Sequence, residues 1–487
     1  MRAALVASVL LASAVAFAQP ADPFAASPVK DWTKPPAATK EPTFKPPVAK
    51  RLKLKNGMAL LVVENHNLPI LSMVLVVPGA GSSGDPKGKY GLASFTADLL
   101  DEGAGGLSPI AIAEEQDRLG AGIGVGVDTD AAYVSVSTLS KTLDETLGLV
   151  TKVLTQPTFD DKEVERVKGD RLTALELRRD RPREVANNIL NAALFGADSP
   201  YGHPTSGARE TFKGITGADA KTFYAEHWNP AGMTLVVAGD VDAAALKTKL
   251  EAGIGAWVVK GAKKAAKPIS PAQKISSRLL VVDRKDAAQS DVRIGLVGLD
   301  RKDKRYAQFE VFRTAFGDGF TSRLTQTLRE KMGIVYNAGA VADWRLAPGP
   351  FYVSTAIQTP STGQGIGKVL EILDDLAKNG LPKEELDKAK QNIIRALPAT
   401  FGTNAGVAGA FAELALQGLP DNWYATYAAS VRTVTAAQVK AIAKAAMPSN
   451  KVVISIVGDY TKIKPEIDKL SLGDPAMHDL YGVPAAK

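Results

Sequence analysis

The chain has 487 residues, of which 45% are hydrophobic, a composition typical of a globular protein with buried cores. Its 59 Lys and Arg against 52 Asp and Glu give a net charge of +7, spread along the chain. This argues against a nucleic-acid-binding surface, where basic residues gather on one face. The lack of cysteine excludes disulfides, thiol nucleophiles and cysteine metal ligands.

The first residues predict an export signal. Arg2, an apolar run over 3–15 and the small residues Ala16 and Ala18 are typical of a secretory signal cleaved near Ala18. The apolar run is too short to cross a bilayer as a helix. We therefore expect an exported protein, periplasmic or extracellular, whose Pro- and Lys-rich residues 19–48 form an extended tether.

Beyond the tether the sequence repeats itself. The run LLVVE that begins at Leu60 returns as LLVVD at Leu279, and LVVAGD at Leu235 returns as ISIVGD at Ile454. Both repeats lie 219 residues after the first copy, and a constant offset at both ends of a long unit indicates a duplication. The predicted organisation is a signal at 1–18, a tether at 19–48, a first lobe at 49–258, a linker at 259–277, a second lobe at 278–470 and a tail at 471–487.

Each half begins and ends with runs rich in Val, Ile and Leu, such as 73–77 and 233–238 in the first half. Long helices are expected between such runs, for example at 162–179, 183–194 and 368–379. This mixture predicts an α+β fold of two homologous lobes, each a mostly antiparallel sheet covered by helices. An extended peptide that adds to a sheet edge would suit two lobes closing on each other.

A short helix is expected at 90–103, YGLASFTADLLDEG. Leu92, Phe95, Leu99 and Leu100 form an apolar stripe at helical spacing, and the other faces carry small and acidic residues. The pattern fits a packed helix with a solvent-exposed side, and it also fits a helix that carries, or once carried, a catalytic site.

Two other features give no support for a site. The loop at 79–89, GAGSSGDPKGK, is not a phosphate-binding loop, because Gly88 and Lys89 are followed by Tyr90 instead of Ser or Thr. A Ser-His-Asp triad stays open by residue count, but no Gly-x-Ser-x-Gly elbow accompanies a strand. The chain has four histidines, His66, His203, His227 and His478, which are too far apart for a zinc-binding pair on one helix. We expect His203 and His227 to end turns or cap helices.

The duplication, the helix at 90–103 and four phrases in order together resemble the pitrilysin/insulinase family of metallopeptidases, the inverzincins, which includes the mitochondrial processing peptidase. The resemblance covers about 53–463. The phrases are PTFDDKEVERVK, LFGADSPYGHPTSG, NPAGMTLVVAGD and SRLTQTLREKMGIVY.

The resemblance implies a zinc helix with the motif His-x-x-Glu-His, and this chain departs from it at every essential position. The family phrase Gly-x-Ala-His-Phe-x-Glu-His places Ser94 and Asp98 where the two His ligands belong and Ala97 where the general base belongs. The third ligand, a Glu on a later helix, falls on Ala174. A catalytic zinc needs three protein ligands and an open position. The implication is a non-catalytic member with no metal or other cofactor of its own.

A second family feature is retained. Active members carry an Arg and a Tyr seven residues apart in the second lobe, which hydrogen-bond the substrate and steady the oxyanion, and Arg329 and Tyr336 match that spacing. Some members work as pairs in which one subunit carries zinc and the other carries Arg and Tyr. The sequence GDGFTS at 317–322 lies where some non-catalytic partners have a flexible substrate-touching loop, and an ordinary helix-entry loop fits it equally well.

We therefore expect an exported, zinc-free subunit of a heterodimeric metallopeptidase that acts on peptides. Its partner would be a homologous peptidase subunit that carries the zinc, and neither a nucleic acid nor a membrane span is expected. The alternative is an exported peptide-binding or scaffold pseudopeptidase without a proteolytic partner. A third reading is an active hydrolase with an unrecognised metal site.

Overall fold

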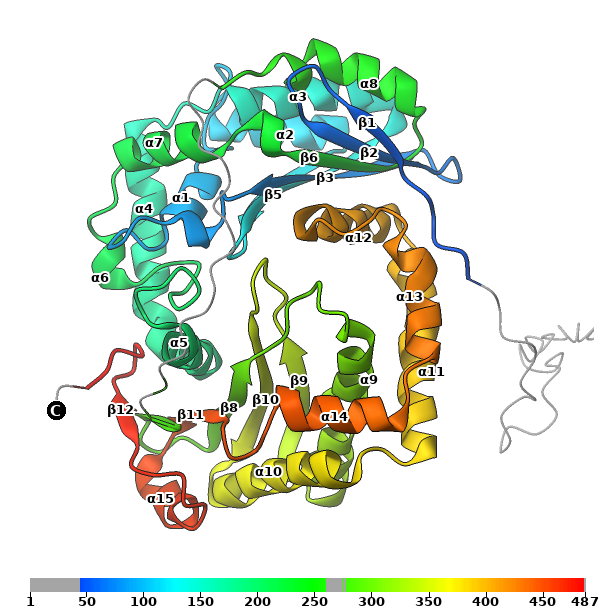
Figure 1. The fold of residues 1–487 in the computed structure, drawn as a ribbon. Coiled ribbons are helices and arrows are strands. Elements are labelled where there is room, and N and C mark those ends of the chain that lie inside the picture. Colours follow the sequence, from blue (N-terminus) through cyan, green and yellow to red (C-terminus); the bar gives the residue numbers. More distant parts are fainter. Residues whose placement is uncertain (1–43, 260–274, 276, 486–487) are drawn as a thin grey trace, which may run out of the picture. The chain divides into compact units, whose positions relative to one another are not determined.

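Two six-stranded sheets, one in each half of the chain, form the framework of the protein (Figure 1). The strand order is β1-β2-β6-β3-β5-β4 in the first sheet and β12-β7-β11-β8-β10-β9 in the second. Neighbouring strands are antiparallel except for the pairs β2/β6, β7/β11 and β7/β12. The predicted α+β fold with two homologous, mostly antiparallel lobes is confirmed. The strands are β1 (Lys50–Lys53), β2 (Ala59–Glu64), β3 (Ile70–Pro78), β4 (Gly122–Val127), β5 (Ala131–Leu139), β6 (Thr234–Gly239), β7 (Leu279–Asp283), β8 (Gln289–Val297), β9 (Val335–Ala342), β10 (Pro350–Gln358), β11 (Val453–Gly458) and β12 (Ala476–His478).

The structure is a computed structural model that describes residues 44–259, 275 and 277–485. The predicted signal, nearly all of the tether and most of the linker lie outside the described residues. Residues that the sequence analysis assigned to a tail contribute β12, in which Ala476 pairs with Leu280 of β7.

Helices connect the strands and cover the sheets (Figure 1). The helix expected at 162–179 ends as an α-helix at Glu176 and continues as a 3₁₀ turn over Leu177–Asp180. The helices of the first half are α1 (Leu92–Asp98), α2 (Pro109–Leu119), α3 (Leu143–Thr155), α4 (Asp161–Glu176), α5 (Pro182–Phe195), α6 (Arg209–Phe212), α7 (Gly217–His227) and α8 (Ala243–Ala252). Those of the second half are α9 (Tyr306–Gly317), α10 (Thr362–Asn379), α11 (Lys383–Thr400), α12 (Asn404–Gln417), α13 (Trp423–Arg432), α14 (Ala436–Ala446) and α15 (Tyr460–Asp468).

The 219-residue repeat is visible in the strand register. Leu60 of β2 lies opposite Leu235 of parallel β6, and their equivalents Leu279 and Ile454 lie opposite each other in β7 and β11. These parallel strands are buried, as their continuous Val, Ile and Leu runs predict. The two halves therefore have the same central register as well as the same class of fold.

Each half also lends one helix to the sheet of the other. Helix α5, from the first half, packs on β8 and β11 of the second sheet, and α12, from the second half, packs on β3 and β6 of the first. The contact of α5 forms a core cluster in which Ile189 and Leu190 are buried together with Leu280 and Val457. The halves are therefore joined by a reciprocal exchange of helices as well as by the linker.

Helix α1 differs from its prediction. It ends at Asp98, so Leu99 and Leu100 are buried beyond the end of the helix. Its other side is not exposed to solvent, since Ser94 and Ala97 are buried as well. α1 is a short helix packed almost all round, and its last residue is the one that is partly exposed.

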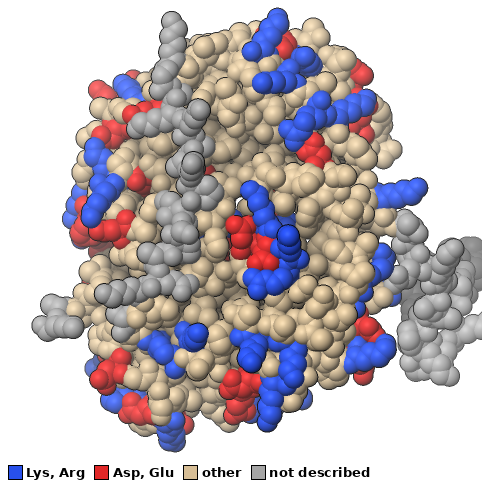
Figure 2. Space-filling model, in the orientation of Figure 1, with Lys and Arg blue, Asp and Glu red and all other residues tan. Residues whose placement is uncertain are grey.

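Two surface properties bear on function. Among the described residues, no helix combines the length and apolar character needed to cross a bilayer. On the face shown in Figure 2, acidic and basic side chains lie interspersed, without a continuous basic stripe.

Candidate functional site

The loop before α1 fixes the start of that helix. The Asp85 carboxylate accepts hydrogen bonds from the backbone N–H groups of Gly91 and Ala93, both at 2.7 Å. It thereby satisfies donors of the first turn, which have no partner within the helix. Gly91 has a φ of 98°, and a Cβ there would lie 2.7 Å from the carbonyl oxygen of Ser206. Only glycine can adopt this backbone conformation here without a steric clash.

An arginine from α4 joins the two positions where the family has its histidine ligands. Arg171 donates from Nη1 to Oγ of Ser94 at 2.6 Å, and its Nη2 forms a very short ion pair with Oδ2 of Asp98. The Arg171 side chain is only 13% exposed. Ala97 lies between Ser94 and Asp98 in sequence, is buried, and offers no polar atom.

Ala174 follows Arg171 by one turn of α4 and is exposed. The region therefore offers one hydroxyl and one carboxylate as potential metal donors, and both already bind a guanidinium. A guanidinium cannot act as a ligand, and its charge opposes a divalent cation. Within the described chain no group of three His, Asp or Glu side chains could hold a metal ion. These residues do not fit zinc.

A polar cavity of about 580 Å³ lies over this region. Asp98 and Arg171 line it from the first half, and Asp343, Arg345 and Tyr352 line it from the second. Three asparagines of α5 complete the wall, namely Asn187, Asn188 and Asn191. The position of the family's metal site is therefore enclosed by both halves.

The loop between β9 and β10 holds the second half against the first at this cavity. Arg345 donates to the carbonyl oxygen of Tyr201 at 3.0 Å, and the N–H of Leu346 donates to Oδ2 of Asp130 at 2.7 Å. The Tyr201 hydroxyl donates to Oδ1 of Asp130 and accepts from the N–H of Ala347. Burial raises the pKa of the Asp130 carboxyl. The sequence analysis did not single out any of these residues.

Arg329 and Tyr336 lie close together in the structure. The Arg329 guanidinium carbon is 5.4 Å from the ring centre of Tyr336 and 4.9 Å from that of Phe320. Arg329 belongs to a π-helical turn, Thr325–Lys331, and Tyr336 belongs to β9. Tyr336 is 83% exposed, so its ring contributes almost no buried surface to the fold.

Arg329 lines a second cavity, of about 550 Å³, that runs along β9. Its wall includes Gly317 and Phe320 of the GDGFTS segment, and the strand residues Asn337 to Ala342. Ser94 and Asp98 line the other cavity, whereas Arg329 lines this one and Tyr336 lines neither.

His203 lies in a turn and His227 at the end of a helix, as expected of these two, and the other two histidines contact neighbouring groups. His203 is buried in a turn, where its ring stacks on Tyr90 with 4.1 Å between centroids and its nitrogens contact two backbone carbonyl oxygens. His66 pairs with Asp240, His227 ends α7, and His478 lies in β12.

Comparison with known proteins identifies the family. The family model for insulinase (peptidase family M16) matches residues 61–208, and the model for the peptidase M16 inactive domain matches residues 214–393. The chain belongs to the insulinase family. Within this family it is a peptidase-like member of the inactive type, which agrees with the residues found at 94, 97, 98 and 174.

Several insulinase-family proteins are similar over most of the chain. An uncharacterized zinc protease from Streptomyces coelicolor is 26% identical over 317 residues, covering 63% of this chain and 68% of that protein. The non-peptidase homolog YmxG from Helicobacter pylori is 24% identical over 407 residues, covering 82% and 92%.

Solved structures agree with the fold. A peptidase M16 inactive domain from Pseudomonas fluorescens superimposes with a TM-score of 0.78 at 27% identity, covering 84% of this chain and 98% of that one. A protease from Helicobacter pylori has a TM-score of 0.75 at 18% identity, covering 85% and 100%.

Proposed function

We propose that this protein is the zinc-free, peptide-binding subunit of a heterodimeric zinc metallopeptidase, exported to the periplasm or beyond. In this proposal a homologous partner carries the zinc, and Arg329 and Tyr336 contact the peptide held in the partner's active site. The exposure of Tyr336 beside Arg329 is the observation that carries the proposal.

The exposure of the Tyr336 ring is informative, because a folded chain normally buries such a ring. A Tyr ring normally contributes to stability through burial, and this one is left in solvent with its hydroxyl free to donate. Arg329 stacks on that ring and on Phe320, which holds the guanidinium beside the phenol. Both groups can donate to a carbonyl oxygen on which negative charge develops, without changing their protonation state.

The edge of the second sheet supports a peptide as the ligand. β9 is the last strand of the order, so one side of its backbone has no strand partner within the part of the chain that the structure describes. The 550 Å³ cavity follows this strand from Asn337 to Ala342. An extended peptide can add to such an edge through main-chain hydrogen bonds while its side chains enter the cavity.

The alternative is a peptide-binding scaffold that works without a proteolytic partner. The relation to a protein named as a non-peptidase homolog favours it. The two proposals share the peptide and differ in whether Arg329 and Tyr336 act on turnover.

The test uses the purified chain together with a co-expressed homologue that has an intact His-x-x-Glu-His motif. Loss of one donor aimed at an oxyanion costs ~10²–10³ in rate, and we expect Tyr336→Phe to lower the turnover of the pair toward the smaller value. Arg329→Lys should also be impaired, because an ammonium lacks the planar fork of a guanidinium. Assembly and thermal stability should stay near wild type.

The controls must be side chains that the fold does not need. Arg323, in the same segment as Arg329, is unsuitable, because it donates to Glu385 at 2.7 Å and to Asp375 at 2.5 Å. Arg118→Lys is better matched, since the Arg118 side chain is 54% exposed and that of Arg323 only 18%. Tyr460→Phe is the tyrosine control, because Tyr460 lies at the start of α15 and lines neither the cavity at Asp98 nor the one at Arg329. Wild-type turnover in both the Arg329 and the Tyr336 variants, within an intact pair, would leave the scaffold proposal.

A further inference from the structure

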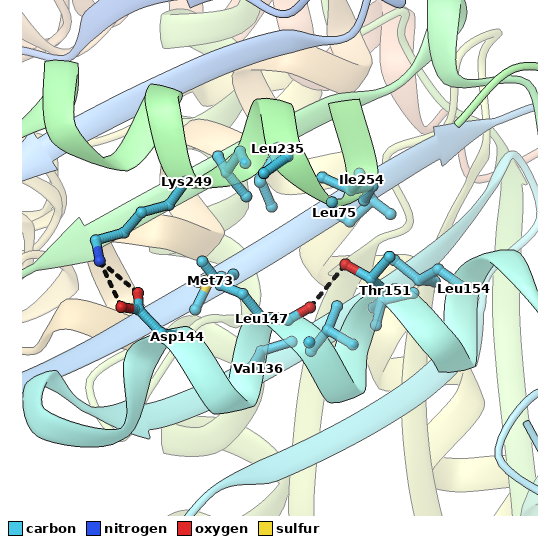
Figure 3. Close-up of a pocket in the computed structure, with 16 residues that line it drawn as sticks. Met73, Leu75, Val136, Asp144, Leu147, Thr151, Leu154, Leu235, Lys249 and Ile254 are labelled. Carbon is cyan, nitrogen blue, oxygen red and sulfur yellow. Dashed lines mark hydrogen bonds and ion pairs between the residues drawn. The ribbon is translucent and has the colours of Figure 1, made fainter. Parts of the chain in front are cut away.

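An apolar cavity of about 390 Å³ lies in the first half, on the face of the sheet covered by α3 and α8 (Figure 3). Its floor is formed by strand residues of β3, β5 and β6, and its sides by the two helices. The lining residues on the floor are Met73, Leu75, Val134, Val136 and Leu235. Those on the sides include Leu147, Val150 and Leu154 of α3, Leu250 of α8, and Ile254 in the turn that follows α8.

This space is a groove that is partly open to solvent, because Asp144, Gly148 and Ala252 in its wall are exposed. Its floor is apolar and offers water few hydrogen-bonding groups, so an apolar ligand that covers the floor removes apolar surface from water. The hydroxyl of Thr151, one of the few polar groups, already donates to the carbonyl oxygen of Leu147 at 2.7 Å.

The second half provides an internal comparison. A Cβ on Gly148 of α3 would meet no atom within 4 Å. Gly367 of α10 is its equivalent 219 residues later, and a Cβ there would lie 3.2 Å from Cδ2 of Leu470. Helix α10 packs directly on α15, whereas the cavity lies between α3 and α8. The cavity is therefore a property of the first half and not of the fold.

One end of the cavity carries charge. Lys249 of α8 donates to both carboxylate oxygens of Asp144 of α3, at 2.5 and 2.7 Å, across that end (Figure 3). The two side chains are 41% and 68% exposed, so this ion pair contributes little and its carboxylate can be exchanged for another. From Asp144 the cavity follows α3 to Leu154, a length of ~15 Å at 1.5 Å per residue.

We propose that this cavity binds a single acyl chain that ends in a carboxylate, such as a fatty acid of medium length. The chain lies on the apolar floor between α3 and α8, and its carboxylate takes the place of Asp144 beside Lys249. This site is separate from the Arg329–Tyr336 pair, which belongs to the other half, and it does not depend on the proposed function.

Calorimetric titration of the full chain with dodecanoate, below the concentration at which it forms micelles, tests the proposal. Gly148→Leu and Thr151→Leu should each weaken binding by ~10-fold or more, because they place new side-chain atoms in the space of the ligand. The matched control is Gly169→Leu, since Gly169 lies within α4, a Cβ there also meets nothing within 4 Å, and it does not line the cavity.

The head group is tested separately. Asp144→Asn should strengthen dodecanoate binding by releasing Lys249, whereas Lys249→Met should weaken it and leave dodecanol binding unchanged. Absence of dodecanoate binding to the wild-type chain, or equal binding by the Gly148 and Gly169 variants, would overturn the site. Equal affinity for dodecanol and dodecanoate in every variant would overturn the carboxylate assignment.

Discussion

At the scale of single residues, the central observation is a guanidinium that joins Ser94 and Asp98. Arg171 reaches from α4 to the two positions on α1 where the family has its histidine ligands. One positive charge thus joins the two helices that a zinc ion would join. The arrangement satisfies Asp98 and Ser94 with hydrogen bonds, so the region is structurally complete as it stands.

Restoring the motif residues alone should therefore not restore zinc binding. The variant with Ser94→His, Ala97→Glu, Asp98→His and Ala174→Glu keeps Arg171, whose charge and bulk lie where the ion would bind. We expect zinc to bind weakly to this variant and markedly more tightly when Arg171→Ala is added, as measured by calorimetry. Equal zinc affinity with and without Arg171 would show that the guanidinium does not exclude the ion.

The loss of the ligands could be predicted from sequence, because the family phrase places each position along one helix. The role of Arg171 could not, since it depends on how α4 crosses α1. Its spacing of three residues before Ala174 was a usable signal, because residues three apart share a helix face. The enclosure by the β9–β10 loop depends on contacts between Arg345, Leu346 and Ala347 and residues some 140 to 220 positions away, which no local pattern reveals.

At the scale of elements, α5 and α12 explain how the halves are joined. The apolar spacing over 183–194 predicts a buried helix face, and α5 has one. The spacing does not say which sheet the face covers, and the structure assigns it to the second sheet. Exchange of this kind follows from tertiary packing, whereas the repeat predicts only that β7 and β11 share the register of β2 and β6.

Shortening a buried side chain of α5 should therefore destabilise the whole molecule. Ile189 is buried in the cluster shared with the second half, so Ile189→Ala should lower the free energy of unfolding by ~2–5 kcal/mol in denaturant melts followed by circular dichroism. Both halves should unfold in one transition. Ile110→Ala is the control, because Ile110 is exposed and should cost less than ~0.5 kcal/mol. Loss of stability confined to one of two transitions would contradict the shared core.

A carboxylate at the start of α15 predicts a specific dependence on pH. Hydrogen bonds from the Thr461 hydroxyl and from Lys462 hold the pKa of Asp459 well below its usual value of 3.8. A lowered pKa adds stability above 3.8 that is lost as the pH falls, because the unfolded chain then binds more protons. Asp459→Asn should be destabilising at pH 7, and its denaturation midpoint should approach that of the wild type below about pH 4.

Asp240, the equivalent residue in the first half, allows a second test of the same pH dependence. Hydrogen bonds from His66 and Ser140 lower the pKa of Asp240, which lies 219 residues before Asp459. Asp240→Asn should change stability with the same sign. A stability difference that is constant from pH 3 to pH 7 for both variants would contradict the assignment.

At the scale of the whole molecule, the duplicated halves depend on each other. The composition of the linker predicts that trypsin cuts first near Lys263 to Lys267. Helix α5 of the first half covers the second sheet, and α12 of the second half covers the first sheet. The two fragments should therefore stay together in gel filtration after this cut and separate only in denaturant. Fragments that separate under native conditions would contradict the exchange. A first cut within β3 or β8 would contradict their assignment as buried strands.

In this insulinase-family chain an ion pair occupies the helix positions at which the resemblance implies zinc ligands. The most direct test is the zinc content of the purified full chain after exposure to excess zinc and removal of unbound metal, measured by mass spectrometry. We expect far less than one zinc per chain, since Ser94, Asp98 and Ala174 supply no adequate ligand set and Arg171 binds the first two. One tightly held zinc per chain, lost on changing Asp98→Ala, would contradict this expectation.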